Sequence, residues 1–236
     1  MPKEYFEFKQ FVIYHDKCAM KVGTDGVLLG AWTTTEQNTK RILDIGTGSG
    51  LIAIMLAQKS DADIIGVDID DSAIQQATEN AYRSTWKERL TFLKTDIKTF
   101  HTDNRFDLIV CNPPFFVNSL HCPNQQRTTA RHSSSLPFET LIKCVYNLLA
   151  NNGLFNVILP YTLVDEFTQL GWECGLHLYK RCIILSKSGD KPIRSILSLT
   201  KDHCDYPKTE YLVIRNKEGE YTEEYKELTK EYYLHF

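Results

Sequence analysis

The chain of 236 residues lacks the features that would assign it to several other classes of protein. Its seven cysteines form no Cys-x-x-Cys pair, and their odd number and irregular spacing support neither a disulfide framework nor a zinc site. No stretch approaches the roughly 18 apolar residues of a membrane-spanning helix, and residues 1–4 lead into no apolar segment like that of a signal peptide. We therefore expect a cytoplasmic protein with reduced thiols, no metal and no membrane segment.

Internal repeats, low-complexity tracts and linker-like stretches are missing as well. A chain of this length with 42% hydrophobic residues can bury a substantial core. We therefore predict a single domain over residues 1–236, in which residues 1–40 form an extension that packs on the core as a lid.

The net charge of −3 neither favours nor excludes nucleic acid, because charge is unevenly distributed along the chain. No acidic residue lies between Asp107 and Glu139, a segment that holds Arg127 and Arg131. Residues 177–201 hold six basic residues against a single acid, Asp190. Either cluster alone is explained by a solvated surface, but the two together favour a polyanionic substrate.

Strands and helices are expected to alternate from residue 41 onward. We predict strands at 42–45, 63–68, 90–94, 106–111 and 154–159, and helices at 51–59, 72–85, 136–150 and 163–170, the third of these helices ended by Asn151-Asn152-Gly153. Such alternation predicts parallel strands with helices on both faces of the sheet. Before this core, residues 5–14 are strand-like, 19–22 form a second short strand, and a short helix at 27–32 is capped by Thr24 or Asp25.

The last predicted pair of strands differs from the rest. Segments 177–185 and 193–200 are both strand-like, and the gap between them is too short for a crossover helix. We therefore predict an antiparallel hairpin at the end of a mostly parallel, Rossmann-like sheet. A dinucleotide-binding dehydrogenase would be expected to end in another parallel strand.

A glycine loop follows the first core strand. It reads Asp44-Ile45-Gly46-Thr47-Gly48-Ser49-Gly50, and its glycines let the backbone turn sharply and approach a ligand closely. The spacing is not the dehydrogenase pattern G-x-G-x-x-G, and no Gly-Lys-Ser/Thr follows, which excludes a P-loop. The carboxylate of Asp44 suits a cationic ligand, such as the methionine end of S-adenosylmethionine, better than a pyrophosphate.

Two further carboxylates follow the next two strands. Asp68 can accept both hydrogen bonds of a ribose diol, as in other nucleoside-binding sheets. Asp96 follows the third strand, and in similar nucleoside-binding sheets an acid at this place commonly meets the adenine amino group. Helix capping and loop solvation are the alternative explanations for both residues.

The sequence Asn112-Pro113-Pro114-Phe115 comes directly after the fourth core strand and indicates chemistry on a planar amine. The lone pair of such an amine is delocalised, so acceptors at Asn112 and at the Pro113 carbonyl would let the nitrogen become tetrahedral. Pro114 has no N–H to compete, and Phe115 can stack on a base. Catalysis would then rest on orientation and electrostatic preorganisation. A plain turn is the alternative explanation.

Residues 21–32, the glycine loop, the Asn112–Phe115 corner, Ala130-Arg131-His132 and residues 228–236 together resemble the bacterial tRNA (adenine-N6)-methyltransferases. These enzymes methylate the adenosine beside the anticodon, position 37, of a valine tRNA. The resemblance implies the α/β class I S-adenosylmethionine-dependent methyltransferase fold, with a short N-terminal β extension.

The resemblance also implies the roles of individual residues. The catalytic corner would be Asn112, Pro113, Pro114 and Phe115, and S-adenosylmethionine would be held by Asp44, Gly46, Gly48, Gly50, Asp68 and Asp96, with Lys21, Thr24 and Asp25 forming a lid. The tRNA would be contacted by Arg131 and His132 in a loop over the site, and by Lys180, Arg181 and Arg194 along the basic hairpin. We expect a monomer.

Three alternatives stay open at the level of the sequence. The Asn-Pro-Pro-aromatic corner also serves release-factor glutamine methyltransferases and rRNA guanine-N2 methyltransferases, although the helical N-terminal domain of the former and the duplicated half of the latter are not evident here. A non-catalytic module that binds S-adenosylmethionine or RNA is the third alternative, against which both motifs are intact.

Overall fold

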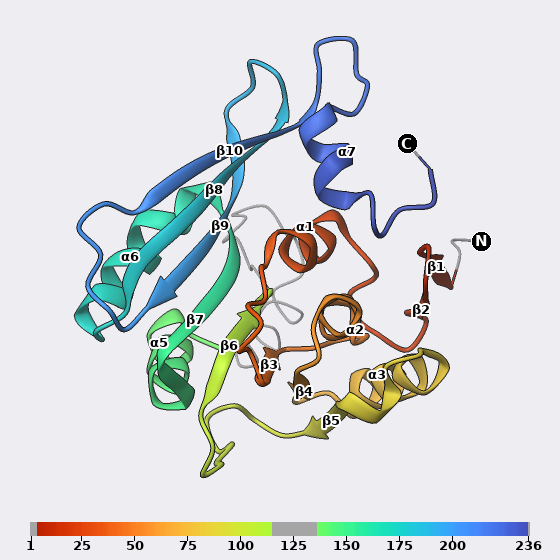
Figure 1. Cartoon of the computed structure of the whole chain (residues 1–236), viewed down its shortest axis with the longest axis vertical. Coiled ribbons are helices and arrows are strands. Elements are labelled where there is room, and N and C mark those ends of the chain that lie inside the picture. The colour runs from red at the N-terminus through yellow and green to blue at the C-terminus, as the bar shows by residue number, and fades with distance from the viewer. Residues whose placement is uncertain (1–3, 115–135, 236) are drawn as a thin grey trace, which may run out of the picture.

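An eight-stranded sheet forms the centre of the protein (Figure 1). The computed structural model describes residues 4–114 and 136–235. The strands of the sheet are β3 (Arg41–Ile45), β4 (Asp63–Asp68), β5 (Leu90–Lys94), β6 (Phe106–Cys111), β7 (Leu149–Pro160), β8 (His177–Lys187), β9 (Pro192–Thr200) and β10 (Lys208–Arg215). Their order across the sheet is β10-β8-β9-β7-β6-β3-β4-β5, and only β9 runs antiparallel to its neighbours. The predicted parallel sheet with an antiparallel hairpin is confirmed.

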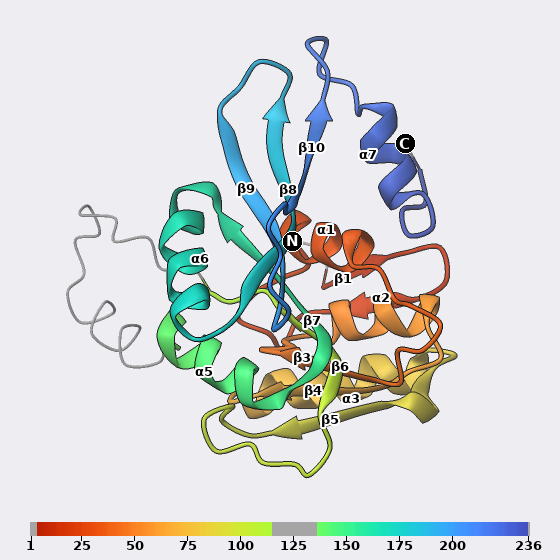
Figure 2. The same ribbon diagram turned by 60° about the vertical axis from the view of Figure 1, so that its left-hand side comes forward.

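Helices cover both faces of this sheet, as the alternating pattern predicted. One apolar core joins the sheet to α1 (Thr24–Trp32), α2 (Leu51–Lys59), the last part of α3 (Asp71–Arg83) and α7 (Glu223–Thr229). The other core lies between the sheet and α5 (Phe138–Leu148) and α6 (Val164–Glu173) (Figure 2). Because both faces are covered, the central strands are almost continuously apolar, and four of the five residues of β3 are buried. None of the helices in the described ranges has the length and apolar character needed to cross a bilayer.

The N-terminal extension contains one hairpin, made of β1 (Tyr5–Glu7) and β2 (Val12–Tyr14). The predicted strand at 19–22 is wrong, because this segment is a bend followed by irregular chain, and backbone amides in it and in the preceding turn donate to side chains instead of to a neighbouring strand. The Lys17 amide donates to Gln76 Oε1 on α3 at 3.2 Å, and the Val22 amide donates to His15 Nδ1 at 3.3 Å. The predicted caps of the next helix are also wrong, since α1 has Gly23 as N-cap and includes Thr24 and Asp25 in its first turn.

The boundary between α5 and β7 differs from the prediction. Helix α5 ends at Leu148, and β7 begins at Leu149 and runs through the Asn-Asn-Gly segment that was predicted to separate them. The pairing with β6 shifts register there, which marks a bulge. A Cβ on Gly153 would lie 2.8 Å from Leu149 Cδ1 and 3.0 Å from the Phe106 carbonyl oxygen, so a glycine allows the close approach.

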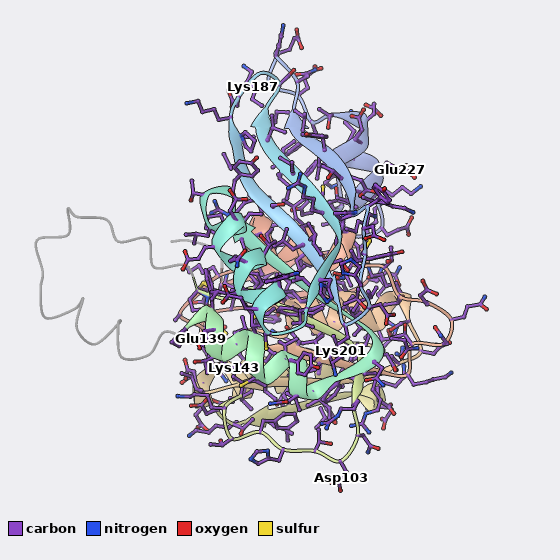
Figure 3. All side chains as sticks on the ribbon, turned by 90° about the vertical axis from the view of Figure 1, so that its left-hand side faces the viewer. Asp103, Glu139, Lys143, Lys187, Lys201 and Glu227 are labelled. Atoms are coloured by element: carbon purple, nitrogen blue, oxygen red, sulfur yellow. The ribbon has the colours of Figure 1, made fainter. Side chains whose placement is uncertain are left out.

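Two elements near the C-terminus were not predicted. Strand β10 adds to the sheet parallel to β8, and α7 follows it. Because β8 and β7 both run antiparallel to β9, they point the same way, and the β8–β9 hairpin extends beyond the edge of the sheet where the parallel strands end. In Figure 3, Lys187 at the tip of this hairpin and Asp103, which precedes β6, lie at opposite ends of the molecule.

The two ends of the described chain lie side by side (Figure 1). The Lys9 amide donates to the Tyr232 carbonyl at 2.8 Å, and the Tyr232 hydroxyl donates to the Met55 carbonyl of α2 at 3.2 Å. The rings of Phe8 and Tyr233 stack with centroids 6.1 Å apart. The C-terminal segment therefore holds the N-terminal hairpin against α2.

Candidate active site

The glycine loop lies at the carboxyl end of β3, where the chain turns into α2. Gly46, Gly48 and Gly50 have φ values of +70°, +54° and +79°, a region that residues with a side chain rarely adopt. The amides of Gly46 and Thr47 both donate to the Val67 carbonyl, at 2.8 and 3.0 Å. A Cβ on Gly46 would meet no atom within 4 Å. The backbone of the loop is thus fixed to β4 while the side of Gly46 remains open for a ligand.

Asp44, the last but one residue of β3, is completely buried. Its Oδ2 accepts a 2.7 Å hydrogen bond from the Thr47 hydroxyl, whereas its Oδ1 is buried without a hydrogen-bond partner. Burial raises the pKa of Asp44 to about 7, a rise that the Thr47 bond opposes and the negative charge of Asp68 reinforces. A buried carboxylate oxygen without a partner is unusual, and it is compensated if a cationic group binds nearby.

Asp68 ends β4 beside the loop and is partly exposed. Its Oδ2 accepts from the Gly48 amide at 3.0 Å, and its Oδ1 accepts from the Asp70 amide, also at 3.0 Å. Each carboxylate oxygen accepts more than one hydrogen bond, so Asp68 retains capacity for a diol. Asp68 thus lies at a strand end beside the glycine loop, as predicted.

Asp96 lies in the turn after β5. Its Oδ1 accepts from the Lys98 amide at 3.0 Å, and its Oδ2 pairs with Lys98 Nζ at 3.0 Å. Burial is the largest single influence on the pKa of Asp96 and would raise it, but the backbone and side-chain hydrogen bonds and the charge of Lys98 together outweigh it, so the pKa is lowered. Asp96 therefore caps a turn and not a helix, and the predicted adenine contact stays a prediction.

The Asn112 corner lies next to the glycine loop because their strands are neighbours. Ile45 at the end of β3 pairs with Cys111 at the end of β6, so both segments leave the sheet at the same edge. Asn112 is partly exposed, Pro113 is buried and Pro114 is exposed. The fourth residue of the predicted corner, Phe115, lies outside the described residues, as do Arg131 and His132.

Helix α1 and the segment before it border this site. A Cβ on Gly26 would lie 3.9 Å from Asn112 Nδ2 and 3.0 Å from Leu51 Cδ2, so α1 packs close to the corner. In the segment before α1, burial and the negative charges of Asp68, Asp70 and Asp16 raise the pKa of Cys18 to about 11. This arrangement is consistent with a lid. Lys21 and Thr24 are exposed, and Asp25 is partly exposed.

The basic hairpin residues predicted to contact RNA already have partners within the chain. Lys180 Nζ pairs with Glu210 at 2.9 Å and lies 4.7 Å from the ring centroid of Trp32. Arg194 Nε pairs with Asp25 Oδ2 at 2.9 Å. Arg181 Nε donates to Thr209 Oγ1 at 3.0 Å on the exposed side of β8. The structure does not gather these three side chains into one free surface.

Two residues of the site were missed at the level of the sequence. Thr47 was treated only as part of the loop, although its hydroxyl holds Asp44. Gly66 lies within β4, where a Cβ would be 2.7 Å from Thr47 Oγ1 and 2.5 Å from Phe92 Cδ1. A glycine inside a strand is itself a signal of close approach, and this signal was available.

The described residues fit S-adenosylmethionine. The open loop at Gly46 accommodates a ligand, the unpartnered Asp44 oxygen suits a cationic amino-acid end, and Asp68 offers acceptors at the neighbouring strand end. The site lies at the carboxyl edge of a parallel sheet, which is where ligands of open α/β sheets bind.

Comparison with known proteins agrees with this assignment. Residues 36–203 match a family described as a methyltransferase domain. The tRNA1(Val) (adenine(37)-N6)-methyltransferase of Bacteroides thetaiotaomicron is 47% identical over 237 residues, covering 100% of this chain and 99% of the relative. Proteins of the same name from Mannheimia succiniciproducens and Yersinia pseudotuberculosis are 41% and 40% identical, each over 98% of this chain and over 95% and 92% of their own length.

Solved structures share the fold at lower identity. A predicted O-methyltransferase of Agrobacterium tumefaciens matches with a TM-score of 0.63 and 17% identity, over 88% of this chain and 96% of its own. The ribosomal protein L11 methylase of Lactobacillus delbrueckii matches with a TM-score of 0.54 and 20% identity, over 75% and 77%. The fold is that of class I S-adenosylmethionine-dependent methyltransferases, and S-adenosylmethionine is the cofactor. The chain belongs to the tRNA1(Val) (adenine(37)-N6)-methyltransferase family.

Proposed function

We propose that the protein transfers the methyl group of S-adenosylmethionine to the exocyclic N6 amine of adenosine 37 in a valine tRNA. The observation that carries the proposal is the adjacency of the Asn112 corner and the glycine loop, whose strands pair at Cys111 and Ile45. One segment suits a methyl donor and the other an amine, and they leave the sheet at the same edge. The names of the full-length relatives support the same substrate.

The methyl donor would be held by residues at the carboxyl ends of β3, β4 and β5. The backbone of Gly46, Gly48 and Gly50 forms the turn. Asp68, which accepts from the Gly48 amide, would also accept from the ribose hydroxyls, and the Asp44 oxygen without a partner would attract the methionine ammonium. Asp96 is proposed for the adenine, and Lys21, Thr24 and Asp25 for the covering segment. The bound cofactor supplies a methyl group on a positively charged sulfur.

The chain's own contribution is to orient the amine. The side-chain oxygen of Asn112 and the Pro113 carbonyl accept its two N–H bonds, so that the nitrogen lone pair is released from the ring and faces the donor. Attack by this nitrogen would form the N–C bond as the C–S bond breaks, and the extra proton would leave the nitrogen for solvent. Because the proton leaves after transfer, no strong base is required. Pro114 removes a competing N–H, and Phe115 is proposed to stack on the base.

The tRNA would present its base by unstacking it from the anticodon loop. Arg131 and His132 are proposed to grip the backbone of the loop, and Arg181, on the exposed side of β8, to contact a phosphate. A tRNA substrate is consistent with a cytoplasmic location, and we propose that the enzyme works as a monomer. Neither the rRNA guanine nor the release-factor glutamine reaction is favoured by the relatives' names.

The test is transfer of labelled methyl groups to total tRNA from a strain that lacks the gene, followed by mass spectrometry of nucleosides. A new N6-methyladenosine in one tRNA is the expected result. Asn112→Ala is expected to lower turnover by roughly 100-fold or more while cofactor affinity stays within about twofold. Labelling of rRNA or of a release factor in place of tRNA would overturn the substrate, and unchanged turnover of Asn112→Ala would overturn the orienting role.

A further inference from the structure

We propose that Arg194 is a positioning residue, whose ion pair with Asp25 holds helix α1 against Asn112. The inference rests on the proposed function, because it concerns the corner that would orient the amine. It gives Arg194 a different task from the RNA contact that its place in the basic hairpin predicted, and it gives Asp25 a task other than covering the cofactor.

The ion pair joins segments that are far apart in the sequence. Arg194 lies near the start of β9, in the hairpin that extends beyond the sheet, and Asp25 lies in the first turn of α1. The distance from Arg194 Nε to Asp25 Oδ2 is 2.9 Å, and Arg194 Nη1 also donates to the Ile193 carbonyl at 3.0 Å. The two side chains are only 33% and 28% exposed. Solvent therefore screens this pair less than a pair on the open surface.

The residue after Asp25 lies close to the amine-orienting side chain. Gly26 is buried, and a Cβ there would lie 3.9 Å from Asn112 Nδ2. The first turn of α1 therefore borders the amide of Asn112. A shift of this turn would change the space around Asn112 and the direction of its side-chain oxygen.

The opposite end of α1 is held by several other contacts. Trp32 Nε1 donates to Glu210 Oε2 at 3.1 Å, and Lys180 pairs with the same carboxylate. Lys59 Nζ donates to the carbonyls of Gly30 at 2.6 Å, of Ala31 at 3.1 Å and of Thr33. This end of the helix is thus fixed to the sheet and to α2 independently of Arg194.

The first turn has less support of its own. Its N-cap is Gly23, which provides no side-chain hydrogen bond, and Thr24 is exposed. Arg194 therefore supplies a side-chain anchor at the end of α1 that lies nearest Asn112. We infer that losing either charge lets the first turn move while the rest of the helix stays in place.

The first experiment measures steady-state methylation of a valine tRNA transcript by the full chain. Arg194→Gln and Asp25→Asn remove one charge each and keep the size of the side chain. We expect each to lower kcat by about 10-fold, within the roughly 100-fold that a misplacement of about 1 Å can cause, with KM for tRNA changed less than about twofold. The double variant should be no worse than the poorer single variant, because both changes break one contact.

Two further variants separate positioning from general destabilisation. The charge exchange Asp25→Arg with Arg194→Asp restores the attraction in reverse and should recover part of the lost kcat. Lys226→Gln is a matched control, because Lys226 belongs to an ion pair on α7 and its side chain is 34% exposed, similar to Arg194. This control should leave kcat unchanged.

Amide hydrogen exchange of the protein alone tests the same inference without tRNA. Arg194→Gln and Asp25→Asn should both speed exchange in peptides covering the start of α1 and in peptides that report the amides of Cys111 and Asn112, and Lys226→Gln should not. If the exchange rates of these peptides are unchanged in both variants, the positioning role is wrong. Absence of methylation by the wild-type enzyme would instead overturn the proposed function.

A different kinetic outcome would indicate that Arg194 contacts RNA. If Arg194→Gln raises KM for tRNA and leaves kcat unchanged, while Asp25→Asn has no effect, Arg194 contacts the substrate and the inference is wrong. Losses in kcat that simply add in the double variant would also overturn it.

Discussion

The Gly48 amide donates a 3.0 Å hydrogen bond to Oδ2 of Asp68, so the carboxylate proposed for the ribose also holds the glycine loop. Asp68 therefore serves the ligand directly and through the loop that surrounds it. A substitution there removes two kinds of support together, and its effect on cofactor binding is expected to exceed that of a single lost hydrogen bond.

Asp68→Ala should weaken S-adenosylmethionine binding by roughly 100-fold, since hydrogen bonds to a charged group contribute about 1.5–3 kcal/mol. Asp68→Asn keeps one acceptor oxygen and should show a smaller loss. Isothermal titration calorimetry of each variant measures the effect. Unchanged affinity in Asp68→Ala would show that this carboxylate does not hold the cofactor.

Asp44 should make cofactor binding depend on pH. Its pKa is about 7, above the ordinary value of 3.8, so it is largely neutral at pH 6 and ionised at pH 8. A cationic ligand favours the ionised form, and affinity for S-adenosylmethionine should rise over this interval. The α-amino group of the ligand titrates near pH 8, at about 7.7–8.0, and Asp44→Asn provides the baseline for that contribution. A pH profile that is identical in Asp44→Asn and wild type would contradict this role.

The stability of the cofactor-free protein should depend on pH in the opposite direction: the contribution of Asp44 falls as pH rises. Because the folded-state pKa of Asp44 is raised, the folded protein binds a proton that the unfolded chain has lost between pH 4 and pH 7. The stability contributed by neutral Asp44 is therefore fully present below about pH 4 and is lost as pH rises through about 7. Thermal unfolding of wild type and Asp44→Asn across this range measures the difference between them.

Asn80 on α3 joins the N-terminal hairpin to the glycine loop. Its Oδ1 accepts from the Tyr14 amide at 3.0 Å, and its Nδ2 donates to the carbonyls of Tyr14 and Ser49 at 2.8 and 2.9 Å. Asn80→Ala leaves the buried Ser49 carbonyl and two partly buried Tyr14 groups without this partner, and we expect a loss of about 2–4 kcal/mol in the free energy of unfolding. Urea denaturation measures this loss. Thr78→Ala, at an exposed position of the same helix, should change stability by less than about 0.5 kcal/mol.

Gly66→Ala should disturb the cofactor site indirectly, through the residues that pack against Gly66. The added Cβ would lie 2.5 Å from Phe92 Cδ1 and 2.7 Å from Thr47 Oγ1, the hydroxyl that bonds Asp44. We expect a loss of about 1–3 kcal/mol in stability and weaker cofactor binding. Gly219→Ala, at a position with φ of +93° where a Cβ meets no atom within 4 Å, adds backbone strain without a clash and therefore measures strain separately from the clash at Gly66. If Gly66→Ala binds the cofactor with wild-type affinity, Thr47 does not contribute to cofactor binding.

The core elements could be predicted because their signals are local. Helix α2 and strands β4, β5 and β6 have the bounds that the sequence predicts, since each is an apolar segment ended by polar or glycine residues. The glycine loop and the Asn112 corner were found for the same reason. Their adjacency followed from the rule that parallel strands end at one edge of a sheet.

The errors arise where distant residues decide the structure. The bulge before Gly153 depends on how closely β6 approaches, and a turn signal in the sequence does not reveal this. Strand β10 is largely exposed at its start and polar, and only pairing with β8 makes it a strand. The ion pair of Arg194 with Asp25 spans 169 positions, so charge patterning assigned Arg194 to RNA and the family resemblance assigned Asp25 to a lid.

The contact between the two ends of the chain sets an order for folding. Lys9 Nζ donates to the Lys230 carbonyl across 221 positions, and the N-terminal hairpin stacks against Tyr233. During synthesis at about 5–20 residues per second, the hairpin is made long before these partners emerge. The hairpin that Asn80 joins to the glycine loop therefore completes its contacts only after residues 230–233 have left the ribosome.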